Sequence, residues 1–207
     1  MRVLHLCLPG DDNLGDQMAH SALPLSFSQY NVSLDIDLID IRQLRNTSKR
    51  LDSKVSYYRD NYDLIIIGAG GLLLPFFMES IFSDPGVWSK LEVPLVFFGV
   101  GAIGEYASNS SYTVMSGADS NHLVSALNAA SVISVRDLRS YLLVSRLVKN
   151  DKVKIFLTGC PTVFCASNKS NAKVTHNLAV NIPFTHGGCY QYREQLSKVA
   201  NLIVHNV

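Results

Sequence analysis

The sequence predicts an α/β fold, in which a Rossmann-like parallel sheet is flanked by helices. Short apolar runs recur along the chain, as expected of strands that are buried on both faces. Helix-length segments separate these runs, which favours parallel strands with crossover connections. Four of the runs end in a glycine-bearing turn: Asn13–Asp16, Gly68–Gly71, Gly99–Gly104 and Gly159–Thr162. In such a sheet a ligand binds beyond the carboxyl ends of the strands.

The first half of the chain is expected to supply four strands. Val32–Ile41 alternates apolar and acidic residues with a period of two, so it should be half exposed. A helix is expected over Gln17–Tyr30, interrupted by Pro24, and Arg42–Asn61 is polar. The other three strands are short apolar runs: Val3–Leu8, Leu64–Ile67 and Val93–Gly99.

The second half is expected to supply two more strands, Ser131–Val135 and Val153–Leu157, and a helix at Leu138–Val148. Glu105–Asn121, rich in Ser and Asn, is predicted to be a surface loop, with Asn121 capping a helix over His122–Ala130. Three domain segments follow from this pattern: a lobe at 1–165, a polar linker at 166–176, and the beginning of a truncated second lobe at 177–207.

Composition limits the classes of function. The chain has 207 residues, 47% of them hydrophobic, and a formal net charge of +1, so nothing draws it as a whole toward nucleic acid. No apolar stretch is long enough to span a membrane, and the amino terminus resembles a strand more than a signal peptide. Four cysteines without a C-x-x-C pair predict neither a disulfide framework nor a metal site. We therefore expect a cytoplasmic protein that binds no metal or other cofactor.

Several motifs have both a chemical and a structural interpretation. Asn13 and Asp16 could face a ligand across a glycine turn or cap the next helix. Arg136, at the end of a strand, could bind a phosphate or carboxylate through its guanidinium, or pair with Asp137. The acidic pair of Asp35 and Asp37 resembles a metal-binding D-x-D but is more consistent with a solvated strand face. The histidines of the C-terminal segment are more often surface or packing residues: His176, His186 and His205.

Gly99-x-Gly101-x-x-Gly104 has the spacing of a dinucleotide fingerprint, but it follows the fourth strand and a polar loop delays any helix. No nicotinamide site is expected there.

Read in order, five segments resemble the polysaccharide pyruvyl transferase family: Asn13–Asp16, Ile65–Leu72, Gly99–Gly101, Ser134–Asp137 and Thr158–Thr162. The resemblance covers roughly residues 1–185, and the order of the segments is more specific than any one of them.

The resemblance implies one lobe of a two-lobe, GT-B-like enzyme whose second lobe is incomplete here. It implies transfer of pyruvate from phosphoenolpyruvate to a pair of sugar hydroxyls, as a ketal, in cell-surface polysaccharide biosynthesis. Arg136 would hold the phosphate or carboxylate of the donor, and Asp16 would carry a proton. The cleft floor would be formed by the residues Asn13, Gly15, Asp16, Gly70 and Gly71.

The implied partners are phosphoenolpyruvate and a saccharide or lipid-linked saccharide, without nucleic acid. Contact with the inner face of the membrane, and pairing with a second-lobe chain or a second copy, are left open. Two alternatives also remain open at this point. One is a GT-B-like glycosyltransferase that uses a nucleotide sugar. The other is a non-catalytic fragment or remnant that binds a phosphorylated metabolite or a partner protein.

Overall fold

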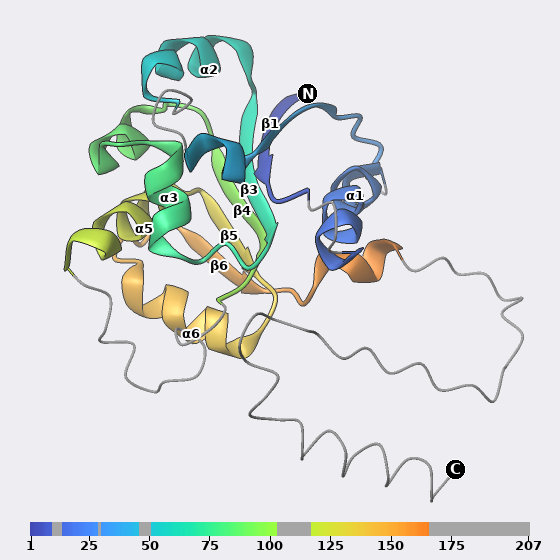
Figure 1. The fold of residues 1–207 in the computed structure, drawn as a ribbon. Helices are drawn as coiled ribbons and strands as arrows, with labels where there is room; N and C mark the ends of the chain where they lie inside the picture. The colour runs from blue at the N-terminus through green and yellow to red at the C-terminus, as the bar shows by residue number, and fades with distance from the viewer. Residues whose placement is uncertain (10–13, 29, 46–50, 103–116, 166–207) are drawn as a thin grey trace, which may run out of the picture. The chain divides into compact units, whose positions relative to one another are not determined.

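A computed structural model describes residues 1–9, 14–28, 30–45, 51–102 and 117–165 (Figure 1). All of them belong to one compact unit, Met1–Ser167. Six strands form its centre: β1 Arg2–Cys7, β2 Asp35–Asp40, β3 Leu64–Gly70, β4 Leu95–Val100, β5 Val132–Val135 and β6 Lys154–Leu157. The α-helices are α1 Leu14–Ser28, α2 Val55–Asn61, α3 Pro75–Ile81, α5 Gly117–Ala129 and α6 Leu138–Leu147. Short 3-10 helices are η1 Ile41–Arg45, η3 Asp52–Lys54, η4 Pro85–Lys90 and η5 Pro161–Cys165.

The six strands form one sheet in the order β2-β1-β3-β4-β5-β6, and all neighbouring pairs are parallel. The predicted α/β class with a parallel sheet is therefore confirmed. From β1 the chain first moves outward to β2, then returns past β1 to β3 and continues in that direction to β6. The order of the strands thus reverses beside β1, between β1 and β3.

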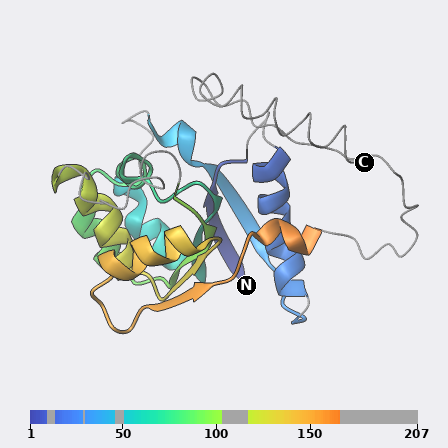
Figure 2. The same cartoon turned by 90° about the horizontal axis from the view of Figure 1, so that it is seen from below.

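This reversal distributes the helices over the two faces of the sheet. Crossovers between parallel strands are right-handed, so connections that run in opposite directions lie on opposite faces. Helix α1, which joins β1 to β2, covers one face, while α3, α5 and α6 cover the other (Figure 2). Helix α1 also packs against η5, which follows the last strand.

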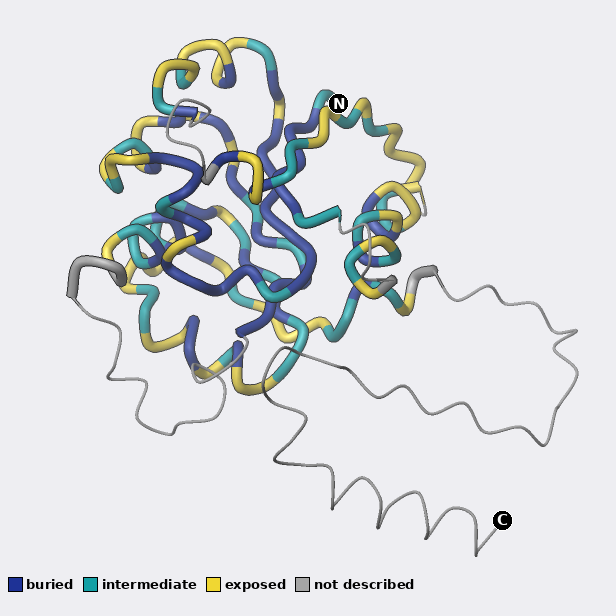
Figure 3. The backbone as a smooth tube through the Cα atoms, viewed as in Figure 1, coloured by how far each residue is buried: buried dark blue, intermediate teal, exposed yellow. Residues whose placement is uncertain are grey.

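The hydrophobic core is accordingly unequal on the two faces. The larger cluster includes Leu4, Ile65, Phe97 and Ile133 from the central strands, together with the buried sides of α3, α5 and α6. On the α1 face a small cluster is formed by Val3, Leu23, Leu64 and Ile66. Figure 3 shows the central strands as buried over most of their length. This burial on both faces explains their nearly continuous apolar sequences.

Three expectations need correction or refinement. Helix α5 begins at Gly117, so Asn121 lies inside the helix and does not cap it. Tertiary context can override the preference of Asn for a cap. The polar stretch after β2 contains a helix, α2, that the sequence analysis did not predict; Tyr58 and Tyr62 anchor it in the core. Helix α1 begins at Leu14 and continues through Pro24.

No helix in the described part of the chain is long and apolar enough to cross a membrane. The predicted linker at 166–176 and the predicted beginning of a second lobe at 177–207 lie outside the described residues, as does most of the expected loop Glu105–Asn121. The division into two lobes stays a prediction.

Candidate functional site

The carboxyl ends of β1, β3, β4 and β5 form the candidate site. Ligands of open α/β sheets bind at this edge, where the strand order reverses. Here the reversal lies between β1 and β3. Three of the predicted segments meet at this edge: the start of α1, the glycine turn after β3 and the glycine turn after β4.

Asp16 lies in the first turn of α1, against the turn that ends β3. Gly70 has φ +120°, and a Cβ atom built on it would lie 3.1 Å from Oδ1 of Asp16. A side chain at position 70 would therefore combine a strained backbone with a tight contact to the carboxylate. The sequence predicted that Asp16 and Gly70 would belong to one site, and the structure brings them together.

Arg136 follows β5, and its side chain packs against Gly101 in the turn after β4. Its backbone N–H donates to the carbonyl of Val100 at 3.0 Å, which anchors the residue to the neighbouring strand. A Cβ atom built on Gly101 would overlap the Arg136 side chain, lying only 2.9 Å from Cζ and 3.0 Å from Cδ. Only glycine at position 101 lets the guanidinium group take this place.

The two glycine turns are joined directly. The N–H of Gly101 donates to the carbonyl of Gly70 at 2.8 Å. Asp16 therefore packs on one turn and Arg136 packs on the other, and a main-chain hydrogen bond connects the two turns. The arrangement gives this edge of the sheet a carboxylate and a guanidinium group on a shared main-chain support.

Asp137 takes both structural roles that the sequence analysis considered. Its carboxylate accepts from the N–H of Ser140 at 2.8 Å and so caps α6. It also lies 3.6 Å from Nε of Arg136, with 32% of the Arg136 side chain and 42% of the Asp137 side chain exposed. An exposed pair of this kind contributes about 0–1 kcal/mol. An incoming anion can therefore compete for the guanidinium group.

A hydroxyl pair supports the neighbouring strand ends. Ser134 Oγ accepts from the N–H of Gly99 at 3.2 Å and lies 2.6 Å from Oγ1 of Thr158. Thr158 follows β6, and its own N–H donates to the carbonyl of Val135 at 3.0 Å. These bonds hold the ends of β4, β5 and β6 in register beside Arg136.

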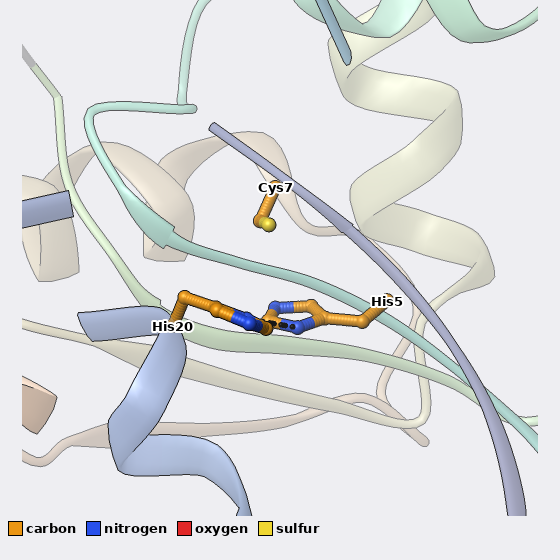
Figure 4. Close-up of side chains that lie close together, drawn as sticks. All are labelled: His5, Cys7 and His20. Carbon is orange, nitrogen blue, oxygen red and sulfur yellow. Dashed lines mark hydrogen bonds between the residues drawn. The ribbon is translucent and has the colours of Figure 1, made fainter. Parts of the chain in front are cut away.

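A histidine pair that the sequence analysis missed lies on the α1 face of this edge (Figure 4). His5 from β1 is fully buried, and His20 comes from α1. Nδ1 of one ring lies 3.2 Å from Nδ1 of the other. Nε2 of His5 contacts the carbonyl of Gly68. Two signals could have revealed the pair: a histidine inside an apolar strand, and the spacing of four residues between Asp16 and His20, which places both on one helix face.

The contacts of His5 define the protonation of both rings. Burial lowers the pKa of His5 to about 4, against a smaller opposing effect of the Gly68 carbonyl, so the ring is neutral near pH 7. A carbonyl can only accept, so Nε2 of His5 carries the proton and Nδ1 offers a lone pair. Nδ1 of His20 is then the donor. Burial also lowers the pKa of His20.

Cys7 follows His5 by two residues and faces the same side of the sheet. It is buried, and burial, followed by the fields of Asp40 and Asp16, raises the pKa of its thiol to about 12. A free thiolate is therefore disfavoured at this position. Cys7 and Cys160, which is half buried, are both free in the described part of the chain.

The remaining predicted residues are placed as follows. Gly15 is exposed in the first turn of α1, and Gly71 directly follows β3. Asp37 lies toward the amino-terminal edge of the sheet, where it accepts from Tyr62 at 2.8 Å and from Arg2 at 3.1 Å, which supports its interpretation as a surface group. The predicted site or candidate residues outside the described part are Asn13, Gly104, His176, His186 and His205.

Comparison with known proteins gives one match. The model of the family described as polysaccharide pyruvyl transferase matches residues 13–205, which is most of the chain. No curated protein and no solved structure matches the chain with significance. On the extent of the family match, this chain belongs to the polysaccharide pyruvyl transferase family.

Proposed function

We propose that this chain takes part in transfer of pyruvate from phosphoenolpyruvate to two hydroxyls of a sugar, forming a ketal. One observation carries the proposal: Asp16 packs against Gly70 and Arg136 packs against Gly101, and a hydrogen bond joins these two glycine turns. Anion binding and proton transfer are the two tasks that this chemistry requires of a protein. Family membership supports the same reaction class.

Arg136 is proposed to bind the phosphate or carboxylate group of the donor. Guanidinium presents N–H donors in a planar fork that matches either anion. Its ion pair with Asp137 is loose, and its side chain is partly accessible, so an anion can approach without first breaking a buried bridge. The backbone of Gly70 and Gly71 would line the floor beside it.

Asp16 is proposed to carry the proton. The reaction begins when the methylene carbon of phosphoenolpyruvate accepts a proton, which leaves a cationic carbon that a sugar hydroxyl attacks. The C–O bond to phosphate then breaks, and a second hydroxyl closes the ketal. Each hydroxyl loses a proton as its oxygen bonds to carbon, and the products are the ketal and inorganic phosphate. A carboxyl group that gives the first proton can take one back from a hydroxyl.

The proposed acceptor is a saccharide or lipid-linked saccharide of a cell-surface polysaccharide pathway, and the proposed location is the cytoplasm, including the inner face of the membrane. Phosphoenolpyruvate is the only small-molecule donor that the proposal needs. A second copy of this chain, or a separate chain that pairs with it, is the proposed protein partner.

Calorimetric titration of phosphoenolpyruvate into the purified chain tests the donor site. We expect saturable binding, loss of that binding in Arg136→Ala, and retention in Arg146→Ala, a matched change in the last turn of α6. UDP-glucose is titrated in parallel. Binding of UDP-glucose without phosphoenolpyruvate would favour a glycosyltransferase. Absence of binding by either ligand would contradict a donor site formed by this chain alone.

A turnover assay tests the proton carrier. With an acceptor saccharide, phosphate release from phosphoenolpyruvate should fall by about 100-fold or more in Asp16→Asn, because one general acid typically contributes a factor of 10² to 10⁴. Phosphoenolpyruvate affinity should change less than turnover. Unchanged turnover would remove Asp16 from the mechanism.

A further inference from the structure

We propose that His5, Cys7 and His20 form a binding site for a thiophilic divalent metal ion of the Zn²⁺ type. One ring nitrogen of each histidine and the sulfur of Cys7 all lie within 4.8 Å of one another. Figure 4 shows the two imidazole rings meeting through their nitrogens, with the Cys7 side chain beside them. The proposal depends on this cluster alone, and not on pyruvyl transfer.

The spacing of the two nitrogens suits a metal ion. Zn²⁺ binds histidine nitrogen at about 2.0–2.1 Å, so two nitrogens in a tetrahedral shell are about 3.3 Å apart. The Nδ1 atoms of His5 and His20 are 3.2 Å apart. A metal ion can thus bind both nitrogens at nearly their present separation, while the proton on Nδ1 of His20 is released to solvent and Nε2 of the same ring takes up another, so that His20 stays neutral.

The sulfur requires a modest adjustment. With a Zn–S bond of about 2.3 Å, sulfur and nitrogen ligands lie about 3.5 Å apart. The widest separation among the three ligand atoms is 4.8 Å at most, so it must contract by about 1.3 Å or less. The thiol of Cys7 releases its proton to solvent as the metal–sulfur bond forms.

The surroundings already hold one ligand in the required orientation. Metal-binding histidines usually donate their second ring N–H to a carboxylate or a backbone carbonyl, which fixes the tautomer and the ring plane. His5 does this toward Gly68. The residue is fully buried, so its ring is held in place by packing as well. Nδ1 of His5 is thereby presented to the cluster as a lone pair.

The charge around the cluster also favours a cation. Asp16 and Asp40 are the acidic groups whose field reaches Cys7, and Arg42 acts in the opposite direction. Negative groups that disfavour a bare thiolate stabilise a divalent ion in the same place. Two neutral imidazoles and one thiolate would leave a bound Zn²⁺ with a charge of about +1.

Three protein ligands leave one tetrahedral position for water or another oxygen ligand, as in catalytic zinc sites. The cluster lies near the carboxyl end of β1, and His20 shares a helix face with Asp16, four residues earlier. An oxygen ligand of the ion would therefore lie on the same side of the sheet as the proposed proton carrier. The sequence analysis expected no metal because it considered the spacing of the cysteines and the acidic pair of Asp35 and Asp37, but not the histidines of β1 and α1; that expectation stays untested, and this proposal departs from it.

Cobalt(II) titration of the chelator-treated, reduced full chain tests the site. We expect one Co²⁺ per chain, intense visible bands of tetrahedral geometry, and a sulfur-to-cobalt charge-transfer band in the near ultraviolet. Cys7→Ser should lose the charge-transfer band, whereas Cys160→Ser, a change at the other described free cysteine, should keep it. His20→Ala should weaken binding at least about 10-fold. His122→Ala is the histidine control.

Circular dichroism of each variant checks that it folds. X-ray absorption of the Zn²⁺-loaded wild-type chain needs no variant, and it should show one sulfur at about 2.3 Å and two nitrogens at about 2.0 Å. A shell of nitrogen and oxygen alone would overturn the proposal. So would a charge-transfer band that survives in Cys7→Ser, or no cobalt binding at all. If the wild-type chain binds cobalt but not phosphoenolpyruvate, the proposed donor site is refuted and the proposed metal site is supported.

Discussion

Replacing Gly101 by alanine should displace Arg136 without straining the main chain. The new methyl group would overlap the Arg136 side chain, whose Cζ and Cδ would lie at 2.9 and 3.0 Å from it. Such overpacking costs about 1–3 kcal/mol when the neighbours cannot move. Because the neighbour here is a partly exposed arginine side chain, we expect it to swing away, so that stability falls by less than that range.

The larger effect should be on anion binding. A hydrogen bond to a charged group contributes about 1.5–3 kcal/mol, so its loss weakens phosphoenolpyruvate binding by about 10- to 150-fold. Calorimetry measures this affinity, and thermal unfolding measures stability. Gly159→Ala is the control: Gly159 has φ +85°, so alanine is strained there, but no atom lies within 4 Å of the added carbon. Wild-type affinity in a folded Gly101→Ala chain would refute the reasoning, as would an equal loss of affinity in Gly159→Ala.

Three further predictions concern stability and the cap of α6. Leu23 is a fully buried residue of α1, so Leu23→Ala should lower the free energy of unfolding, measured with denaturant, by about 2–5 kcal/mol. Leu25 is 45% exposed on the same helix, so Leu25→Ala should lower it much less. Equal losses in the two variants would contradict the packing of α1. Hydrogen bonds from Tyr62 and then Arg2 lower the pKa of Asp37, so the stability that the carboxylate contributes is present above pH about 4 and is lost as the pH falls below that value. The free energy of unfolding of Asp37→Asn should therefore depend less on pH in that range than that of the wild-type chain, and an unchanged pH dependence would contradict this reasoning. Asp137→Ala removes the cap of α6 and should lower the free energy of unfolding by about 1 kcal/mol. Asp137→Asn should keep the cap and, because it removes the charge beside Arg136, bind phosphoenolpyruvate several-fold more tightly in calorimetry. Weaker binding in Asp137→Asn would show that the carboxylate positions Arg136.

The sequence was a good guide to the sheet because its central strands are buried on both faces. Apolar runs such as Ile65–Ile67 are buried on both sides only between two layers of helices, and all six strands that the sequence predicted within residues 1–165 are present. The sequence was a poor guide to α2, because its residues are mostly polar. The burial of Tyr58 and Tyr62 in the core, with Val55 packed against the same cluster, stabilises that segment as a helix.

The candidate site likewise has features that the sequence could predict and features that it could not. Asp16, Gly70 and Arg136 were predictable because a parallel sheet gathers the ends of its strands at one edge. The direct contact between Gly101 and Arg136 was not predictable, since it depends on how the turn after β4 approaches β5. Asn13 and the C-terminal histidines lie outside the described residues and remain predictions.

By itself the sequence determined the fold class, the family and the end of the sheet at which the candidate site lies, because apolar periodicity, turn glycines and motif order are local properties of the chain. The tertiary structure alone decided that His5 and His20, fifteen positions apart, share a hydrogen bond beside Cys7. The physical reason is the crossover from β1 through α1, which returns the helix over its own strand and brings side chains together that no local pattern connects.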